Sequence, residues 1–438
     1  MTSEDGKPPR PPCVHAQFDV GTTDDSLELM TQYGAEFGDI YRVFAPGRGR
    51  DTWVVADPET IKRVLVSNHR SYTVGAGLDR VRVLVGDGII VSEGETWKRQ
   101  HRMMQPMFQR SRVEQFGEVI VDTTRRRLAG WADKAASGAE LNVTRETSES
   151  ALEVVLRATL GADFDRLCSE LGSNPFALLT EESVRDLRFA FRFRQLGRHV
   201  DAMIRRRESG ASAAGDGDWL GMMMAARDRG DGSAMSHREL IDEVMSIIVA
   251  GHETTAAVLN SVWYLLSQHP QVEAKLHAEV DAVEFADWRL STVETLHYTH
   301  QVIMEALRLY PPVWVLTRRC VHADRLLGYE APAGTDVFMS PYVVQRDPRH
   351  WPDPDQFRPE RFQSGAQSAP HRFAFIPFSA GPRHCVGETF ATYEMVIHLY
   401  LAARRFRLRC RQSEPPQMEA RINLRMREDL MMCVEARV

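Results

Sequence analysis

The 438 residues include 54 basic and 60 acidic side chains, giving a formal net charge of −6. This acidic balance argues against a nucleic-acid binder, and 43% hydrophobic residues is ordinary for a folded domain. No run of about 18 apolar residues occurs, so no membrane span is expected. The polar, proline-rich start lacks the apolar core of a secretion signal, which predicts a cytoplasmic protein.

The first half of the chain predicts a leader followed by helices. Residues 1–30 are expected to form a flexible leader, and residues 31–438 a single domain. Residues 71–95 are rich in glycine and predict a long loop with short helical pieces. Apolar residues then follow helical spacing from Glu95 to about Pro106. The same spacing continues through 112–136 and 145–160.

Polar loops are predicted at 208–218 and 227–236, and a long helix follows. This helix should run from Ser236 to His269, because Ser236 and Glu239 form a capping-box pattern. Its middle, VMSIIVAG, is apolar on all sides, which predicts a buried helix.

The last third of the chain mixes helices and strands. A helix from Leu296 to Tyr310 is ended by two prolines, and another is expected over 388–404. Residues 325–345 and the tail after Arg405 alternate like strands. We therefore expect a mainly α fold with smaller β-sheets, of the α+β class.

Cys385 differs from the other five cysteines in its surroundings. No cysteine belongs to a CxxC pair and no export signal is present, so neither a zinc site nor a disulfide framework is expected. Cys385 lies in FSAGPRHCVGETFA, which resembles the heme-binding segment of the cytochrome P-450 family, Phe-x-x-Gly-x-basic-x-Cys-x-Gly. The matching residues are Phe378, Gly381, Arg383, Cys385 and Gly387. The resemblance implies that family's fold, a triangular prism with buried heme b whose axial ligand is the Cys385 thiolate.

Further heme contacts follow from the resemblance. Arg383 should pair with a propionate, Phe378 should cover the sulfur, and Gly387 should permit close backbone approach. Trp97 and His101 are similar to the family's Trp-x-x-x-Arg, with histidine at the usual arginine position. Arg102 competes with His101 for this role. Arg318, or its neighbour Arg319, resembles another propionate contact.

The segment Ala250-Gly251-His252-Glu253-Thr254-Thr255 resembles the family's oxygen-activating motif. A side chain at Gly251 is expected to crowd the distal face of the heme. A threonine hydroxyl can bond back to a carbonyl and bend the helix. The resemblance makes Thr254 the hydrogen-bond donor at the reacting oxygen and Glu253 the proton relay.

A charged cluster is expected to support the cysteine loop. Glu305 and Arg308 are three residues apart on one helix face. Downstream, Phe357–Phe362 resembles the family's Phe-x-Pro-Glu-Arg-Phe, so Arg361 should complete the cluster. Its role would be structural, because buried charges require mutual pairing.

The substrate pocket is expected to be apolar, so a small hydrophobic substrate is predicted. Four stretches should line it: 78–90, 247–250, 312–316 and 422–424. Residues 163–200 should form its lid. The individual residues expected in the pocket are Leu84, Ile247, Ala250, Val313, Val315 and Asn423.

The predicted function is a monomeric heme-thiolate monooxygenase that transfers one oxygen atom from O2 by hydroxylation or epoxidation, in natural-product or lipid metabolism. Electrons from NAD(P)H would arrive through a ferredoxin or flavodoxin with its reductase, because no electron-transfer domain is expected in the chain. An acidic partner would dock on Lys98, Arg99, Arg404 and Arg405. The alternatives are a peroxide-driven or non-oxygenating heme-thiolate enzyme and a non-catalytic heme sensor.

Overall fold

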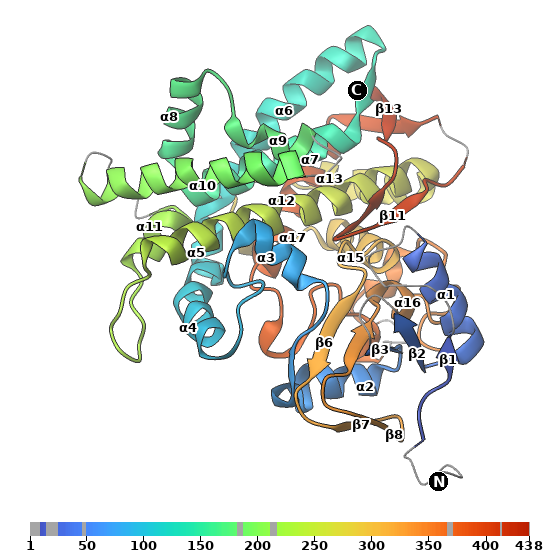
Figure 1. Cartoon of the computed structure of the whole chain (residues 1–438). Coiled ribbons are helices and arrows are strands. Elements are labelled where there is room, and N and C mark those ends of the chain that lie inside the picture. Colours follow the sequence, from blue (N-terminus) through green and yellow to red (C-terminus); the bar gives the residue numbers. More distant parts are fainter. Residues whose placement is uncertain are drawn as a thin grey trace. The chain divides into compact units, whose positions relative to one another are not determined.

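The computed structural model describes residues 9–14, 25–45, 50–181, 187–210, 217–365, 371–411 and 414–437 (Figure 1). The chain forms two compact units, each assembled from three separate segments. Unit 1 comprises Met1–Leu78, Met304–Cys385 and Pro415–Glu428, and unit 2 comprises Asp79–Ile303, Val386–Glu414 and Asp429–Val438. The single domain expected over 31–438 stays a prediction.

Unit 1 is built around a six-stranded mixed sheet. The pairs β1/β2 and β3/β9 are parallel, and the others are antiparallel. Residues 9–14 of the expected leader belong to this fold, because β1 pairs with β2 through Cys13 opposite Arg42. In pairing order the strands are β1 (Cys13–Val14), β2 (Ile40–Ala45), β3 (Arg50–Val55), β9 (Asp336–Met339), β6 (Leu316–Cys320) and β4 (Tyr72–Val74).

Helices and two small hairpins complete unit 1. The helices are α1 (Ser26–Phe37), α2 (Pro58–Lys62), which continues as a π-helical turn to Ser67, and α16 (Pro341–Val344). The hairpins are β7 (Asp324–Leu326) with β8 (Tyr329–Ala331), and β11 (Met418–Ala420) with β12 (Leu424–Met426).

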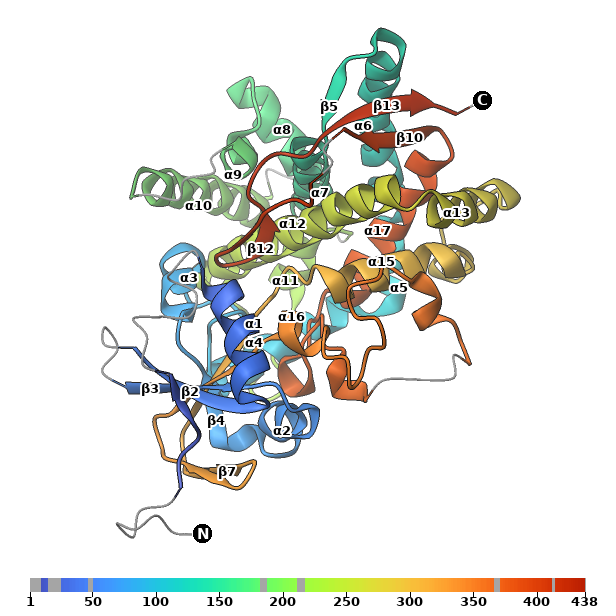
Figure 2. The ribbon, with the colours of Figure 1, turned by 90° about the vertical axis from the view of Figure 1, so that its right-hand side faces the viewer.

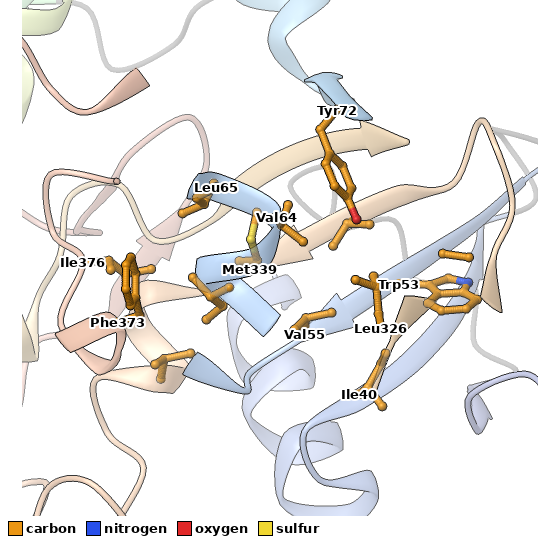
Figure 3. Close-up of a cluster of buried hydrophobic side chains, with 14 of the residues drawn as sticks. Ile40, Trp53, Val55, Val64, Leu65, Tyr72, Leu326, Met339, Phe373 and Ile376 are labelled. Carbon is orange, nitrogen blue, oxygen red and sulfur yellow. The ribbon is translucent and has the colours of Figure 1, made fainter. Parts of the chain in front are cut away.

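Both faces of the central strands are buried, and each face has its own core. The pleat sends alternate side chains to opposite faces. Trp53, Val55 and Met339 belong to one hydrophobic cluster (Figure 3). Val54 and Phe338, one residue removed, belong to the other. This double burial explains why β9, DVFM, is buried at every position.

Unit 2 is mainly helical. A three-stranded antiparallel sheet accompanies the helices, in the order β10 (Phe406–Cys410), β13 (Met431–Ala436), β5 (Glu140–Asn142). Residues of α15 (His297–Leu309) divide between the units at Met304. The other helices are α3 (Leu78–Val85), α4 (Gly94–Met104), α5 (Arg110–Val113), α6 (Gly117–Ser137), α7 (Val143–Leu160), α8 (Ala162–Leu171), α9 (Leu178–Glu181), α10 (Leu187–Glu208), α11 (Trp219–Ala225), α12 (His237–Gln268), α13 (Pro270–Ala282), α14 (Leu290–Val293) and α17 (Glu388–Ala403).

The long helix α12 is the axis of unit 2, and α7 packs along it (Figure 2). The predicted capping box is confirmed, because the Ser236 hydroxyl and the Glu239 carboxylate each bond the other's backbone N–H. Near the far end of α12, the Trp263 indole N–H donates to Nε2 of the buried His398 on α17.

The main departure from the predicted elements lies in 71–95. Residues 78–85 form α3, which agrees with the short helical pieces expected in this loop, but residues 72–74 form the unexpected strand β4. β4 pairs with β6, whose residues lie more than two hundred positions further along the chain. Such a partner leaves no local sequence signal. Within the described part of the chain, no helix is long and apolar enough to cross a bilayer.

Candidate functional site

The Cys385 loop is held by backbone contacts within unit 1. The Cys385 N–H donates to the Phe378 carbonyl at 2.9 Å, and the Cys385 side chain is exposed. Gly381 has φ +72°, and a Cβ there would come within 2.0 Å of the Leu65 carbonyl oxygen. Ser379 also has a positive φ, 62°, which is uncommon for a side-chain-bearing residue. The loop is therefore a tight, partly strained turn that leaves Cys385 exposed.

The structure brings the three predicted charges of the supporting cluster together. Arg308 donates to both carboxylate oxygens of Glu305, at 2.7 and 2.8 Å, and Arg361 Nε lies 3.2 Å from Glu305 Oε1. Glu305 and Arg308 are fully buried. Burial lowers the pKa of Arg361, and the neighbouring Glu305 opposes that shift. Each buried charge thus has a partner of opposite sign, which is the condition for tolerating it.

Sequence reasoning missed Gln345, which connects this cluster to the segment before the cysteine loop. Its amide donates to the carbonyls of Leu307 and Arg308, at 3.0 and 3.1 Å. Its Oε1 accepts from the Ile376 N–H, and Arg308 in turn donates to the Gln345 carbonyl. No motif marks this residue, because any buried amide at the right distance would suit.

Strand β6 separates the two candidate propionate arginines of unit 1. Arg319 makes a bidentate ion pair with the buried Asp336, at 2.8 and 3.1 Å. Arg318 projects to the opposite face of the strand, where its Nη1 donates to the Thr317 carbonyl. Because Arg319 is committed to Asp336, Arg318 remains the better candidate for a ligand contact.

In unit 2, helix α4 also carries two candidates for one propionate contact, His101 and Arg102. The Trp97 and His101 rings pack one turn apart, with centroids 4.9 Å from each other. Arg102 instead makes a bidentate pair with Asp228, at 3.1–3.2 Å. Arg102 is thereby engaged within the chain, which favours His101 for the role that the sequence left open.

The expected basic docking patch is partly neutralised. Arg99 forms an ion pair with Glu239 and donates to the Ala234 carbonyl, and Lys98 pairs with Glu95 at 2.7 Å. Arg404 donates to the Tyr400 hydroxyl. The loop 227–236 is consequently bound against α4 through Asp228, Ser233 and Ala234.

Helix α12 carries one exposed stripe in an otherwise buried stretch. Ala250 is exposed and Glu253, Thr254 and Ala257 are half-buried, whereas the residues from Asp242 to Ile248 are all buried. These four positions lie at i, i+3, i+4 and i+7, so they share one face. The Thr254 hydroxyl donates to the Ala250 carbonyl at 2.7 Å, the back-bond that the sequence predicted.

The structure shows a packing role for Gly251. A Cβ at Gly251 would meet Val155 Cγ2 of α7 at 2.8 Å. The glycine therefore permits the close packing of α12 on α7. The predicted crowding of the heme face by a side chain at this position stays a prediction.

The predicted pocket residues differ in burial and belong to both units. In unit 2, Ile247 is buried, Leu84 is half-buried and Ala250 is exposed. In unit 1, Val313 and Asn423 are half-buried, and Val315 packs against a hydrophobic core cluster. Part of the expected lid, 182–186, lies outside the described residues.

The residues present fit a heme group on the chemistry of each unit's own donors. Unit 1 supplies an exposed thiol on a turn closed by a backbone hydrogen bond, together with Arg318 and Arg383. Unit 2 supplies an α12 stripe whose small residues, Ala250 and Ala257, flank one acid and one alcohol. A thiolate is one of the axial ligands that heme iron takes, and basic side chains pair with anionic groups such as propionates.

Comparisons with known proteins agree with this chemistry. A family model described as "Cytochrome P450" matches residues 6–434. Cyclooctat-9-en-7-ol 5-monooxygenase of Streptomyces melanosporofaciens is 33% identical over 85% of this chain and 83% of its own length. Pentalenene oxygenase of Streptomyces avermitilis is 30% identical over 85% of this chain and 84% of its own. The crystal structure of the cytochrome P450DA heme domain matches with a TM-score of 0.85 at 23% identity, covering 98% of both chains.

Proposed function

This chain belongs to the cytochrome P450 family and is an oxidoreductase of the monooxygenase class; we propose that its substrate is a hydrophobic terpenoid. Two relatives carry names that refer to oxidation of such molecules, cyclooctat-9-en-7-ol and pentalenene. The reaction would insert one oxygen atom from O2 into a C–H or C=C bond. The heme b group would supply the oxygen-activating chemistry, with Cys385 as its axial thiolate.

The observation that carries the proposed oxygen-transfer reaction is the half-buried acid and alcohol, Glu253 and Thr254, on α12. The Thr254 hydroxyl donates its single hydrogen to the Ala250 carbonyl, so its oxygen can accept a further hydrogen bond. It would have to turn away from that carbonyl to donate to the reacting oxygen. Glu253, the adjacent residue on the same stripe, would replace the donated proton from solvent. Trp97, His101, Arg318 and Arg383 would hold the cofactor's anionic edge.

The electrons would come from NAD(P)H through a separate ferredoxin or flavodoxin and its reductase. Because Arg99 is already paired with Glu239, the docking patch would rely more on Arg404 and Arg405 than on α4. A peroxide-driven reaction is the second candidate. The presence of Glu253 and Thr254 argues against a peroxide-driven reaction, since direct use of peroxide requires no delivery of protons from solvent. The same two residues argue against a non-catalytic heme sensor.

The first test is the spectrum of the reduced, CO-bound holoprotein, which should show the long-wavelength Soret band of thiolate ligation. Cys385→Ser should lose this band and Cys410→Ser, a matched control, should keep it. A shorter-wavelength band in the intact protein would contradict the assignment of Cys385.

The second test addresses substrate and electron source together. Terpene hydrocarbons and their monoalcohols are titrated while the heme spectrum is followed, and each binder is incubated with a ferredoxin system or with peroxide. We expect products by mass spectrometry only with the ferredoxin system. Equal turnover with peroxide would favour the second candidate.

A further inference from the structure

A glycine-rich segment of unit 2, the 86–92 loop (Gly86–Ser92), is attached to the first half of α12 by two carboxylates. The Asp87 N–H donates to Asp242 Oδ2 at 3.0 Å, and the Ile89 N–H donates to Glu243 Oε2 at 3.0 Å. Consecutive side chains of a buried helix therefore satisfy alternate backbone donors of the loop.

The two glycines explain how the loop comes so close to α12. A Cβ at Gly88 would lie 2.0 Å from Ser246 Oγ and 2.7 Å from the Asp242 carbonyl oxygen. Because that carbonyl belongs to the helix backbone, it cannot move aside. Gly86 has φ +63°, and its Cβ would meet the Asp242 carboxylate. Any larger residue at Gly88 would push the loop off the helix.

Two further elements bind the other side of the loop. On α4, the Gln100 amide donates to the Asp87 carbonyl at 2.8 Å, and the Ser92 hydroxyl donates to Gln100 Oε1. On α3, Arg82 donates to the Val91 carbonyl at 3.0 Å. The α12 side is different, because it alone depends on ionisable groups that are buried.

The closed contact leaves polar atoms of α12 unsatisfied. Glu243 is fully buried and its Oε1 has no hydrogen-bond partner, and neither has the Oγ of the buried Ser246. An unsatisfied buried polar group opposes the closed contact, because it has lost its hydrogen bonds to water. The contact between loop and helix is therefore favoured by two backbone hydrogen bonds and opposed by these two atoms.

The charges around Glu243 favour its neutral form. Burial raises the pKa of Glu243 to about 8, with Asp242 and Glu239 of α12 adding to the shift and the bond from Ile89 opposing it. The pKa of Asp242 is itself raised by burial. The nearby cations are committed elsewhere: Arg238 pairs with Asp242, Arg82 with Asp87, and Arg99 with Glu239.

We propose that Glu243 is a positioning residue that holds the 86–92 loop on α12 as a neutral carboxylic acid, and that its ionisation releases the loop. Once ionised, Glu243 would face two further carboxylates without a cation of its own. Opening the loop lets water reach the charge and also hydrates Ser246. The loop would thus be held most firmly under mildly acidic conditions and would open progressively as the pH rises toward 8.

The direction of the pH dependence follows from the two states. In the closed state the pKa of Glu243 is about 8, whereas in an open, hydrated loop it returns to the ordinary value near 4.3. The closed state therefore binds more protons, and its advantage is lost as the pH rises toward 8. For a single titrating proton with these two pKa values, the equilibrium constant for loop opening increases about 50-fold from pH 6 to pH 8.

Hydrogen exchange resolved to the Asp87 and Ile89 amides tests this on the full chain. Protection factors, corrected for the intrinsic exchange rate at each pH, should fall by tens of fold from pH 6 to pH 8. Glu243→Gln keeps the acceptor for Ile89 but cannot ionise, so its protection should be nearly independent of pH. Glu330→Gln, an exposed control in unit 1, should follow the unmodified protein.

Two results would overturn the proposal: pH-independent protection in the unmodified protein, or a Glu243→Gln variant with the same slope. Asp242→Asn provides a second check. It removes a neighbouring charge that raises the pKa of Glu243, so the fall in protection should be smaller and should level off at a lower pH.

The consequence for substrate access rests on the proposed function, because only that assignment places the neighbouring 78–90 stretch at a pocket. The binding rate of 4-phenylimidazole, followed by the heme spectrum, should then rise with pH in parallel with loop opening. If hydrogen exchange shows that the loop opens but the binding rate does not change with pH, Glu243 controls the loop and the 78–90 stretch does not lie at the substrate pocket.

Discussion

At the scale of single residues, Glu305 shows how a buried charge can stabilise a fold. Its carboxylate receives two hydrogen bonds from Arg308, one from Arg361 and one from the Arg358 backbone N–H. Arg308 also donates to the carbonyl of Gln345. A single guanidinium therefore joins α15 to the chain that leads toward the cysteine loop.

Arg308→Ala should destabilise unit 1 by about 3–5 kcal/mol, because it leaves buried acceptors without donors. Urea unfolding monitored by circular dichroism measures the change. The free energy of unfolding of Arg308→Lys should lie between those of the unmodified protein and Arg308→Ala, because an ammonium keeps the charge but not the fork of donors. Arg325→Ala, at an exposed site, should be nearly neutral. An Arg308→Ala protein as stable as that control would contradict the role.

The Thr254 hydroxyl has a different kind of test, because its predicted role concerns protons and not stability. Thr254→Ala should keep the fold and bind substrate, yet divert most NAD(P)H oxidation to hydrogen peroxide. Comparing peroxide with product per NAD(P)H consumed measures this. Thr255→Ala, at the buried neighbour, is the matched control. If Thr254→Ala forms as much product per NAD(P)H consumed as the unmodified protein, Thr254 has no role in the reaction.

At the scale of elements, ion pairs hold helix α4 through Arg99 and Arg102. Arg99 and Arg102 bind Glu239 and Asp228, and these contacts leave the Trp97–His101 face turned the other way. Hydrogen bonds from Arg102 hold the pKa of Asp228 below its ordinary value. The carboxylate is therefore ionised at neutral pH, and the contact weakens only as the pH falls through that lowered pKa.

Asp228→Ala should loosen α4, because Arg102 loses its bidentate partner. Amide exchange in 97–104 should become faster, while exchange in the second half of α12 stays the same. Asp133→Ala, on the exposed surface of α6, serves as control. Equal exchange in both variants would show that the 227–236 loop does not restrain α4.

Elements with local signals were predicted, and the features that were missed depend on remote partners. The Ser236–Glu239 capping box set the start of α12, and Pro311 set the end of α15. In contrast, β4 depends on β6, and the 86–92 loop depends on Asp242 and Glu243. The same division holds for the site. Cys385 and Thr254 lie in contiguous motifs, whereas Gln345 acts through distant backbone atoms.

At the scale of the whole molecule, acid should destabilise the core of unit 2 through His398. This buried histidine accepts from the Trp263 indole and packs against the Trp131 ring. Burial lowers the pKa of His398 to about 4. The unfolded chain therefore binds more protons than the folded one between about pH 6.5 and pH 4, and stability is lost as the pH falls through that window.

The unfolding free energy should fall by about 1.5 kcal/mol between pH 6.5 and pH 5 because of His398 alone. His398→Gln removes the titration and keeps an acceptor for Trp263. Urea unfolding at both pH values should show the smaller loss in this variant. His350→Gln, in unit 1, is the control. Equal slopes for His398→Gln and the unmodified protein would contradict the assignment.

The segmented sheet of unit 1 also has a consequence for synthesis on the ribosome. Strand β3 pairs with β9, and about 280 residues separate the end of the first from the start of the second. At the usual elongation rates of about 5–20 residues per second, β3 waits roughly 15–55 seconds for its neighbour. During this interval its edge is unpaired and its Trp53 face is uncovered. An unpaired strand edge can pair with another copy of the chain, so we expect the yield of folded protein to fall when many copies are synthesised at once.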